Sequence, residues 1–143
     1  MEKQMIKQQG FTLIEILIVM AIIGLLAGLV GPKIFGGFEQ AKCNQAKAQL
    51  KNIEVALDQH RLDTGKYPRG LDGLLTNTVS SNRWSGPYLK QQAVPTDPWE
   101  HQYQYKTPGT KGGDYDLYSL GGDGVEGGQG CPNEDITNWK SAS

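Results

Sequence analysis

The chain has 143 residues, with 14 Lys and Arg against 15 Asp and Glu, so its formal net charge is -1. This length allows one modest domain, and the balanced charge gives no general attraction to nucleic acid, which is not expected as a partner. The two cysteines do not form a C-x-x-C pair, so a thiolate metal site is not expected either.

The first strong signal is an apolar segment over residues 11–31, which contains a single ionisable side chain, Glu15. Its length matches the ~20 residues that a helix needs to cross a bilayer, so it is predicted to be a transmembrane helix. Lys3 and Lys7 precede it, and such charges favour the cytoplasmic side for that end. The rest of the chain is then expected on the far side, the periplasm of a Gram-negative cell.

The apolar segment is predicted to remain in the mature protein, because no small-residue cleavage site follows it. Gly10 stands at the boundary between the polar and apolar residues. A carboxylate in hydrocarbon costs about 2.5–3.5 kcal/mol on insertion scales, so Glu15 needs a partner. The alternative is that Glu15 lies close enough to the membrane surface to be solvated.

Type IV pilins and type II secretion pseudopilins begin with a segment that residues 7–34 closely resemble, KQQGFTLIEILIVMAIIGLLAGLVGPKI. The resemblance implies that a prepilin peptidase removes residues 1–10 as a leader by cutting between Gly10 and Phe11. It also implies N-methylation of Phe11 and retention of residues 11–31 as anchor and filament core. Glu15 would pair with the terminal amine of a neighbouring subunit, so that two charges are neutralised together.

Beyond the apolar segment, an amphipathic helix is predicted over residues 33–63. Pro32 and the glycines around it weaken the helix, and local melting there during filament packing is implied by the resemblance. Apolar residues then recur at roughly helical spacing, which favours docking of one helix face on a sheet. They are Phe38, Ala41, Ala46, Leu50, Ile53 and Leu57. Turn-forming residues after Asp63 predict the helix end.

The remaining chain is predicted to form a small antiparallel sheet. A short helix is expected over residues 71–75 and a loop over 77–87. Polar and aromatic residues alternate over 102–106 and, less cleanly, over 114–120, which is typical of a hairpin packed on the long helix. The predicted fold class is α+β.

Four further segments narrow the resemblance to the major pseudopilins of type II secretion, the general secretion pathway protein G family. They are TGKYP at 64–68, GPYL at 86–89, VPTDPW at 94–99 and DYDLYSLGGDG at 114–124. The family implies a type IV pilin-like fold in a single-pass protein of the bacterial inner membrane, with the head, residues 32–143, in the periplasm. One departure is that Glu100 and Gln102 stand where the family usually has glycine and proline.

The last loop is acidic and rich in glycine. Residues 113–138 hold Asp114, Asp116, Asp123, Glu126, Glu134 and Asp135 but no Lys or Arg. Oxygen donors on such a loop suit calcium, although the spacing is not that of an EF-hand, and a solvated acidic loop is the alternative. The resemblance implies a structural calcium ion and a metal-binding loop. Its ligands would be the Asp123 and Asp135 side chains and the Leu120 carbonyl, with Asn133 or Glu126 as further candidates.

Cys43 on the predicted long helix and Cys131 in the last loop are able to form one disulfide in an oxidising compartment. The sequence does not give their separation, and two unrelated thiols are the alternative. An enzyme is not expected, because neither His60 nor His101 has a nucleophile or metal-ligand spacing around it.

The function implied by the resemblance is that of a major filament subunit, which polymerises in the periplasm and drives export of folded proteins across the outer membrane. The implied partners are further copies of the chain, minor pseudopilins, prepilin peptidase, membrane lipid, and an inner-membrane assembly platform with its ATPase. A type IV pilus subunit for motility, adhesion or DNA uptake and a membrane-tethered calcium-binding module are the alternatives. Replacing Glu15 by Leu would separate a filament subunit from a tethered module.

Overall fold

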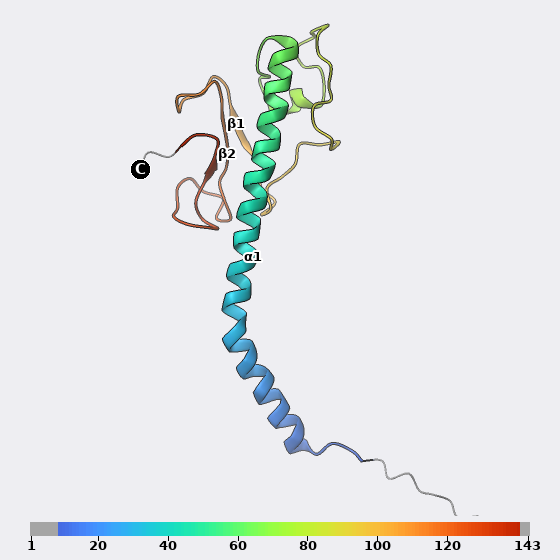
Figure 1. Cartoon of the computed structure of the whole chain (residues 1–143), viewed down its shortest axis with the longest axis vertical. Helices are drawn as coiled ribbons and strands as arrows, with labels where there is room; N and C mark the ends of the chain where they lie inside the picture. Colours follow the sequence, from blue (N-terminus) through green and yellow to red (C-terminus); the bar gives the residue numbers. More distant parts are fainter. Residues whose placement is uncertain (1–8, 141–143) are drawn as a thin grey trace, which may run out of the picture. The chain divides into compact units, whose positions relative to one another are not determined.

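A computed structural model describes residues 9–140 of the chain (Figure 1). Its elements, in order, are α1 (Leu13–Thr64), the 3-10 helix η1 (Leu71–Leu74), β1 (Gln104–Lys106), β2 (Asp116–Ser119) and β3 (Ile136–Thr137). The chain divides into two compact units, with the boundary between Gly37 and Phe38 inside α1. Most of the predicted leader, residues 1–8, lies outside the described part.

The first unit, called the anchor below, has no core of its own. None of the α1 residues before Cys43 is buried, and Leu13 and Leu17 are 86% and 68% exposed. Helix begins at Leu13 instead of residue 11, and it includes Pro32. The boundary of this unit at Gly37 differs from the predicted start of the head at residue 32.

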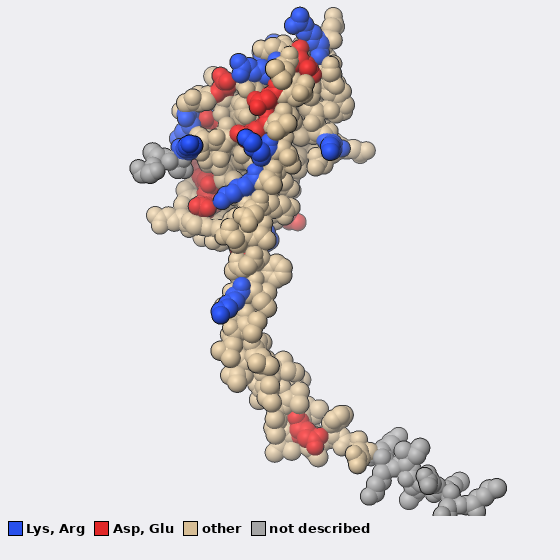
Figure 2. Space-filling view, viewed as in Figure 1, with Lys and Arg blue, Asp and Glu red and all other residues tan. Residues whose placement is uncertain are grey.

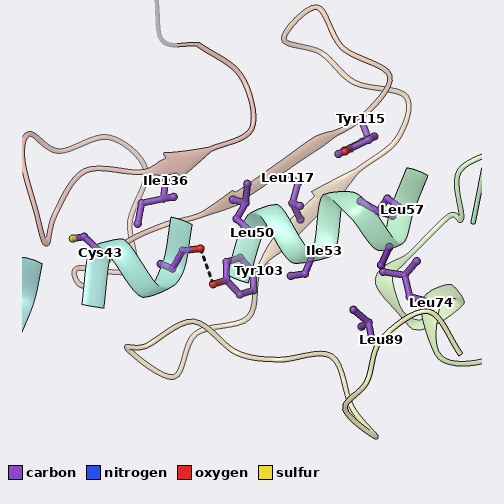
Figure 3. Packing of buried hydrophobic residues seen from close by; sticks show 12 residues of the cluster. Cys43, Leu50, Ile53, Leu57, Leu74, Leu89, Tyr103, Tyr115, Leu117 and Ile136 are labelled. Atoms are coloured by element: carbon purple, nitrogen blue, oxygen red, sulfur yellow. Dashed lines mark hydrogen bonds between the residues drawn. The ribbon is translucent and has the colours of Figure 1, made fainter. Parts of the chain in front are cut away.

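The second unit, called the head below, is built on the buried face of α1 (Figure 3). This face presents residues spaced three and four apart, and these pack with side chains from η1, the sheet and the connecting loops. The core comprises Cys43, Ala46, Leu50, Ile53, Ala56, Leu57, Leu74, Leu89, Tyr103, Tyr115, Leu117 and Ile136. The predicted face is confirmed from Ala46 onward, but Phe38 is 62% exposed and Ala41 is also exposed, so the prediction was wrong at its N-terminal end.

The sheet is three-stranded and antiparallel, in the order β1-β2-β3. The predicted hairpin is confirmed as β1 and β2, in which Gln104 pairs with Tyr118 and Lys106 with Asp116. β3 was not predicted, because two residues are too short to show an alternating pattern. The long helix ends at Thr64, one residue after the expected position.

Candidate functional sites in the N-terminal segment and the last loop

The start of α1 is capped by Thr12. Its hydroxyl accepts a hydrogen bond from the backbone N–H of Glu15 at 3.3 Å, which satisfies one of the free donors at the helix N-terminus. Glu15 therefore lies in the first turn, where the helix dipole favours a negative charge. The Thr12-x-x-Glu15 spacing is a capping-box signal that could have identified Thr12 from the sequence.

Gly10 and Phe11 precede the helix and are exposed. A Cβ atom placed on Gly10 would meet no atom within 4 Å, and Gly10 has no positive φ. Folding within the described residues therefore does not require glycine at this position. A requirement for glycine at this position would come from a molecule that binds the Gly10–Phe11 junction.

The anchor helix is long and apolar enough to cross a membrane, and none of its most apolar window is buried. The core helix of a water-soluble protein would instead be largely covered by other elements. Figure 2 shows the anchor almost free of charge, with Glu15 and Lys33 as the only charged residues among residues 9–37. Among residues 9–140 this helix is the single candidate for a membrane span.

A disulfide between Cys43 and Cys131 joins the last loop of the head to α1. Their Cα atoms are 6.3 Å apart, and 88 positions separate the two residues in the sequence. Cys43 is 1% exposed. The loop is thereby tied covalently to the part of α1 that carries the core.

A buried carboxylate, Asp97, holds the turn that faces the last loop. Its Oδ1 atom accepts the N–H groups of Trp99 and His101 at 3.1 and 2.8 Å, and its Oδ2 atom accepts the Ser119 hydroxyl at 2.6 Å. Since Ser119 ends β2, these bonds connect the turn to the sheet. The sequence analysis noted the VPTDPW segment but missed this role, because the bonds join residues up to 22 positions apart.

Glu100, which stands where the family usually has glycine, lies in the same turn. Glu100 has φ of 66°, in the left-handed region that is disfavoured for residues with a side chain. Its N–H donates to the Asp97 carbonyl at 3.0 Å, which closes the turn. A glycine would adopt this conformation without the Cβ penalty, so the usual family residue fits the observed backbone.

The five predicted calcium ligands are not brought together as one set. Glu126 and Asp135 line a common cavity of about 360 Å³, whereas Asp123 and Asn133 are exposed and are not among its lining residues. Asp135 Oδ2 accepts the Gly127 N–H at 3.0 Å across the loop. Asp123 Oδ1 accepts the N–H of Val125 at 3.2 Å.

One carboxylate oxygen of this loop is suited to bind a cation. Asp135 Oδ1 is buried and has no hydrogen-bond partner in the described part of the chain, and a buried carboxylate oxygen is costly to leave unpaired. Within residues 9–140, no cluster of three or more His, Cys, Asp and Glu side chains is placed to hold a metal. An ion held here would therefore depend largely on backbone carbonyls such as that of Leu120, a ligand type that calcium accepts.

Asp116 also lines this cavity but is already satisfied. Burial alone would raise the pKa of its carboxyl group, yet the Thr110 hydroxyl and the N–H groups of Thr110 and Lys111 hold this pKa below its ordinary value. The ionised Asp116 thus fixes the turn between β1 and β2. Asp135 Oδ1 is the buried carboxylate oxygen of the cavity that has no hydrogen-bond partner among residues 9–140.

Known families match both units of the chain. Residues 33–139 match the family described as "Type II secretion system (T2SS), protein G", and residues 5–31 match the "Prokaryotic N-terminal methylation motif". Together the two matches extend over the anchor and the head.

Individual relatives are similar over nearly the whole chain. Type II secretion system core protein G of Pseudomonas aeruginosa is 46% identical over 140 residues, covering 93% of this chain and 96% of the relative. The protein of the same name from Vibrio cholerae is 43% identical, covering 96% and 95%. A crystal structure of the major pseudopilin from the type 2 secretion system of enterohaemorrhagic Escherichia coli has a TM-score of 0.58 and 31% identity, covering 76% of this chain and 95% of that one.

Proposed function

The chain belongs to the type II secretion system protein G family, and on this basis we propose that it is the major structural subunit of a type II secretion pseudopilus. The observation that carries the proposal is the contrast within one chain. An anchor whose apolar side chains are all uncovered follows an open Gly10–Phe11 junction, and a separately folded head follows the anchor. Packing the anchor against lipid or against other anchors removes this apolar surface from water and so stabilises the subunit.

Polymerisation would begin with processing at Gly10 and Phe11. Cleavage there would free an amine at Phe11, four residues before the Glu15 carboxylate, and methylation would modify that amine. In an apolar filament core, the carboxylate of one subunit and the amine of a neighbour would each be costly alone, and pairing neutralises both. The Thr12 cap supports this by starting the helix directly after the new terminus.

The head would lie in the periplasm. The Cys43–Cys131 disulfide supports this placement, because disulfides persist in oxidising compartments and are rare in the cytosol. Minor pseudopilins, the prepilin peptidase and an inner-membrane platform with its ATPase would be the partners of assembly. The filament of copies would then drive folded proteins across the outer membrane.

The test is complementation of a strain that lacks its own subunit. The wild-type chain is expected to restore secretion and to give periplasmic filaments, whereas Glu15→Leu abolishes both. Val19→Leu, a change within the same exposed helix face that removes no charge, serves as the control and should keep both. If Glu15→Leu remained fully active, a tethered module would be favoured; filaments that restored motility without secretion would favour a pilus subunit.

We further propose that the last loop binds a structural calcium ion. Asp135 and Asp123 would supply carboxylate oxygens and Leu120 its carbonyl, with Glu126 or Asn133 as further donors. The bound ion would pair with the buried Asp135 Oδ1 atom and hold the loop against the head.

The measurement is thermal unfolding of the purified full chain in detergent, with calcium and with a chelator. Calcium at one hundred times its Kd should stabilise the head by about 2.7 kcal/mol. Asp135→Asn should remove that gain, whereas Asp72→Asn on η1 should leave it unchanged. An equal response of the two variants to calcium would contradict the assignment.

A further inference from the structure

The last loop of the head closes on its own final segment, residues 130–135, called the closing segment below. The Gly122 N–H donates to the Pro132 carbonyl at 2.7 Å. Further along, the Gly127 N–H donates to Asp135 Oδ2 at 3.0 Å. The closing segment therefore holds both the start and the middle of the loop, and the loop keeps its shape only while this segment stays in place.

The closing segment is tied to the core by its cysteine. None of residues 122–135 is buried, and Val125 is 59% exposed. Cys131, by contrast, packs on the hydrophobic core, where its disulfide partner Cys43 is 1% exposed. Burial of apolar side chains thus contributes little to the order of this loop, and the disulfide is the covalent tie of the closing segment to α1.

The same segment carries the atom that is suited to bind a cation. Asp135 comes four residues after Cys131, and its Oδ1 atom is buried without a hydrogen-bond partner among residues 9–140. The next residue, Ile136, belongs to the core and begins β3, which has only two residues (Figure 3). Asp135 therefore lies between a covalent attachment to α1 and a very short strand. We expect the covalent attachment to decide how firmly its carboxylate is held.

Without the disulfide, a cation would have to order the loop as it binds. Residues 121–130 include six glycines, which lose more backbone freedom on ordering than any other residue. In the reduced chain this loss of freedom opposes cation binding. In the oxidised chain, a crosslink between positions 88 apart in the sequence has already removed part of it. The oxidised chain is therefore expected to bind the cation more tightly.

We propose that oxidation of Cys43 and Cys131 completes the cation site of the last loop, and that oxidation and calcium binding each favour the other. The inference rests on the calcium site proposed above. By linkage, the factor by which oxidation tightens calcium binding equals the factor by which calcium favours the oxidised pair.

The oxidant is the disulfide of a second protein, a thiol–disulfide oxidoreductase. The two thiols of the chain give two electrons and two protons to that disulfide. The oxidoreductase leaves as a dithiol as the Cys43–Cys131 bond forms. Oxidation by such a protein then comes before calcium loading of the head.

The first test is isothermal titration of the full chain in detergent with calcium chloride. The serine variant, with Cys43→Ser and Cys131→Ser together, should bind calcium about ten-fold or more weakly than the oxidised wild type. Leu57→Ala, a change in the core outside the last loop, is the control and should keep the wild-type Kd within about two-fold. Circular dichroism shows whether each variant is folded at the temperature of the titration.

The second test measures the reverse effect on the wild-type chain. The chain is equilibrated in glutathione buffers of graded redox potential at constant ionic strength, with saturating calcium or with a chelator. The oxidised fraction is measured by mass after alkylation of the free thiols. Calcium should shift the midpoint to a more negative potential by about 30 mV for each ten-fold difference in affinity. Asp135→Asn, which keeps both cysteines, should have the same midpoint in both buffers.

The outcomes separate this inference from the proposals on which it rests. Equal calcium affinity of the wild type and the serine variant, or a midpoint that does not respond to calcium, would overturn the inference while the calcium site stands. An equal loss of affinity in Leu57→Ala would also overturn it, because the coupling would then act through global stability. If the serine variant does not fold, the midpoint of the wild type decides. Absence of calcium binding to the wild type would overturn both the calcium site and the inference, whereas the filament function is tested separately by Glu15→Leu.

Discussion

The anchor and the head each contain part of the same helix, but they differ in what this helix does with its apolar side chains. The anchor exposes them and the head buries them. In the anchor every described large apolar side chain is exposed, so its stability must come from lipid or from other copies. In the head the same helix buries Ile53 and Leu57 completely and is fastened to the last loop by a disulfide. The head is therefore expected to be stable as a single subunit. The apolar side chains of the anchor, by contrast, are expected to be covered only in a membrane or a filament.

The strongest test of this contrast is removal of the disulfide. Replacing Cys43 and Cys131 together by serine should cost the head roughly 4–5 kcal/mol, the loop-closure value for a separation of 88 residues. Urea unfolding of the full chain in detergent, followed by Trp fluorescence, measures the loss. Membrane extraction of the variant should match that of the wild type, because the anchor has no part in the bond; a stability change below about 1 kcal/mol would contradict the account.

A core truncation sharpens the contrast along a single helix. Leu57→Ala should destabilise the head by about 2–5 kcal/mol, because Leu57 has no exposed surface and leaves a cavity. Leu62→Ala, at a position 77% exposed, should change the free energy of unfolding by less than about 0.5 kcal/mol. Similar losses for the two leucines would show that the assignment of faces is wrong.

Glycines of the last loop give a smaller effect. Gly121 has φ of 72°, and a Cβ there would lie 2.6 Å from the Pro132 carbonyl oxygen and 2.8 Å from that of Glu134. Gly121→Ala should therefore cost about 2–3 kcal/mol, since strain and backbone collision add. The matched control is Gly127→Ala, which has φ of 89° but open space and should cost only about 1 kcal/mol. Equal losses would mean that the collision is relieved at no cost.

The smallest expected effect is at alkaline pH. Burial raises the pKa of Tyr105 to about 12, so the folded head favours the neutral phenol. This contribution is complete below the unfolded pKa of about 10 and is lost as the pH rises through about 12. Unfolding temperatures should fall between these values, and Tyr105→Phe should weaken the dependence. The anchor has no tyrosine among residues 9–37, so its helix content should not follow the same curve.

Sequence reasoning worked best where one element carries its own periodicity. The spacing of Ala46, Leu50, Ile53 and Leu57 predicted the buried face of α1, and the alternation around Tyr103 and Tyr105 predicted the hairpin. It failed at Phe38 and Ala41, which are exposed, because apolar composition alone does not distinguish a buried helix face from an exposed one.

The site was less accessible to sequence reasoning, because its contacts join distant segments. Asp97 binds Ser119, and Trp99 donates to Glu39 at 3.1 Å, bonds that no local spacing indicates. The calcium ligand set stays a prediction for the same reason, since the loop conformation determines which oxygens meet. Thr12 is the exception, because its spacing to Glu15 is a capping signal that the sequence alone contains, although it was not used to predict the cap.

The most direct test of the filament-subunit account is the intact mass of the protein from cells with and without an active prepilin peptidase. With the peptidase, the mass should correspond to residues 11–143 carrying one added methyl group and one disulfide; without it, the full 143-residue chain should be found. An unprocessed chain in both strains would contradict processing at Gly10, and with it the central claim that this anchor is prepared for polymerisation.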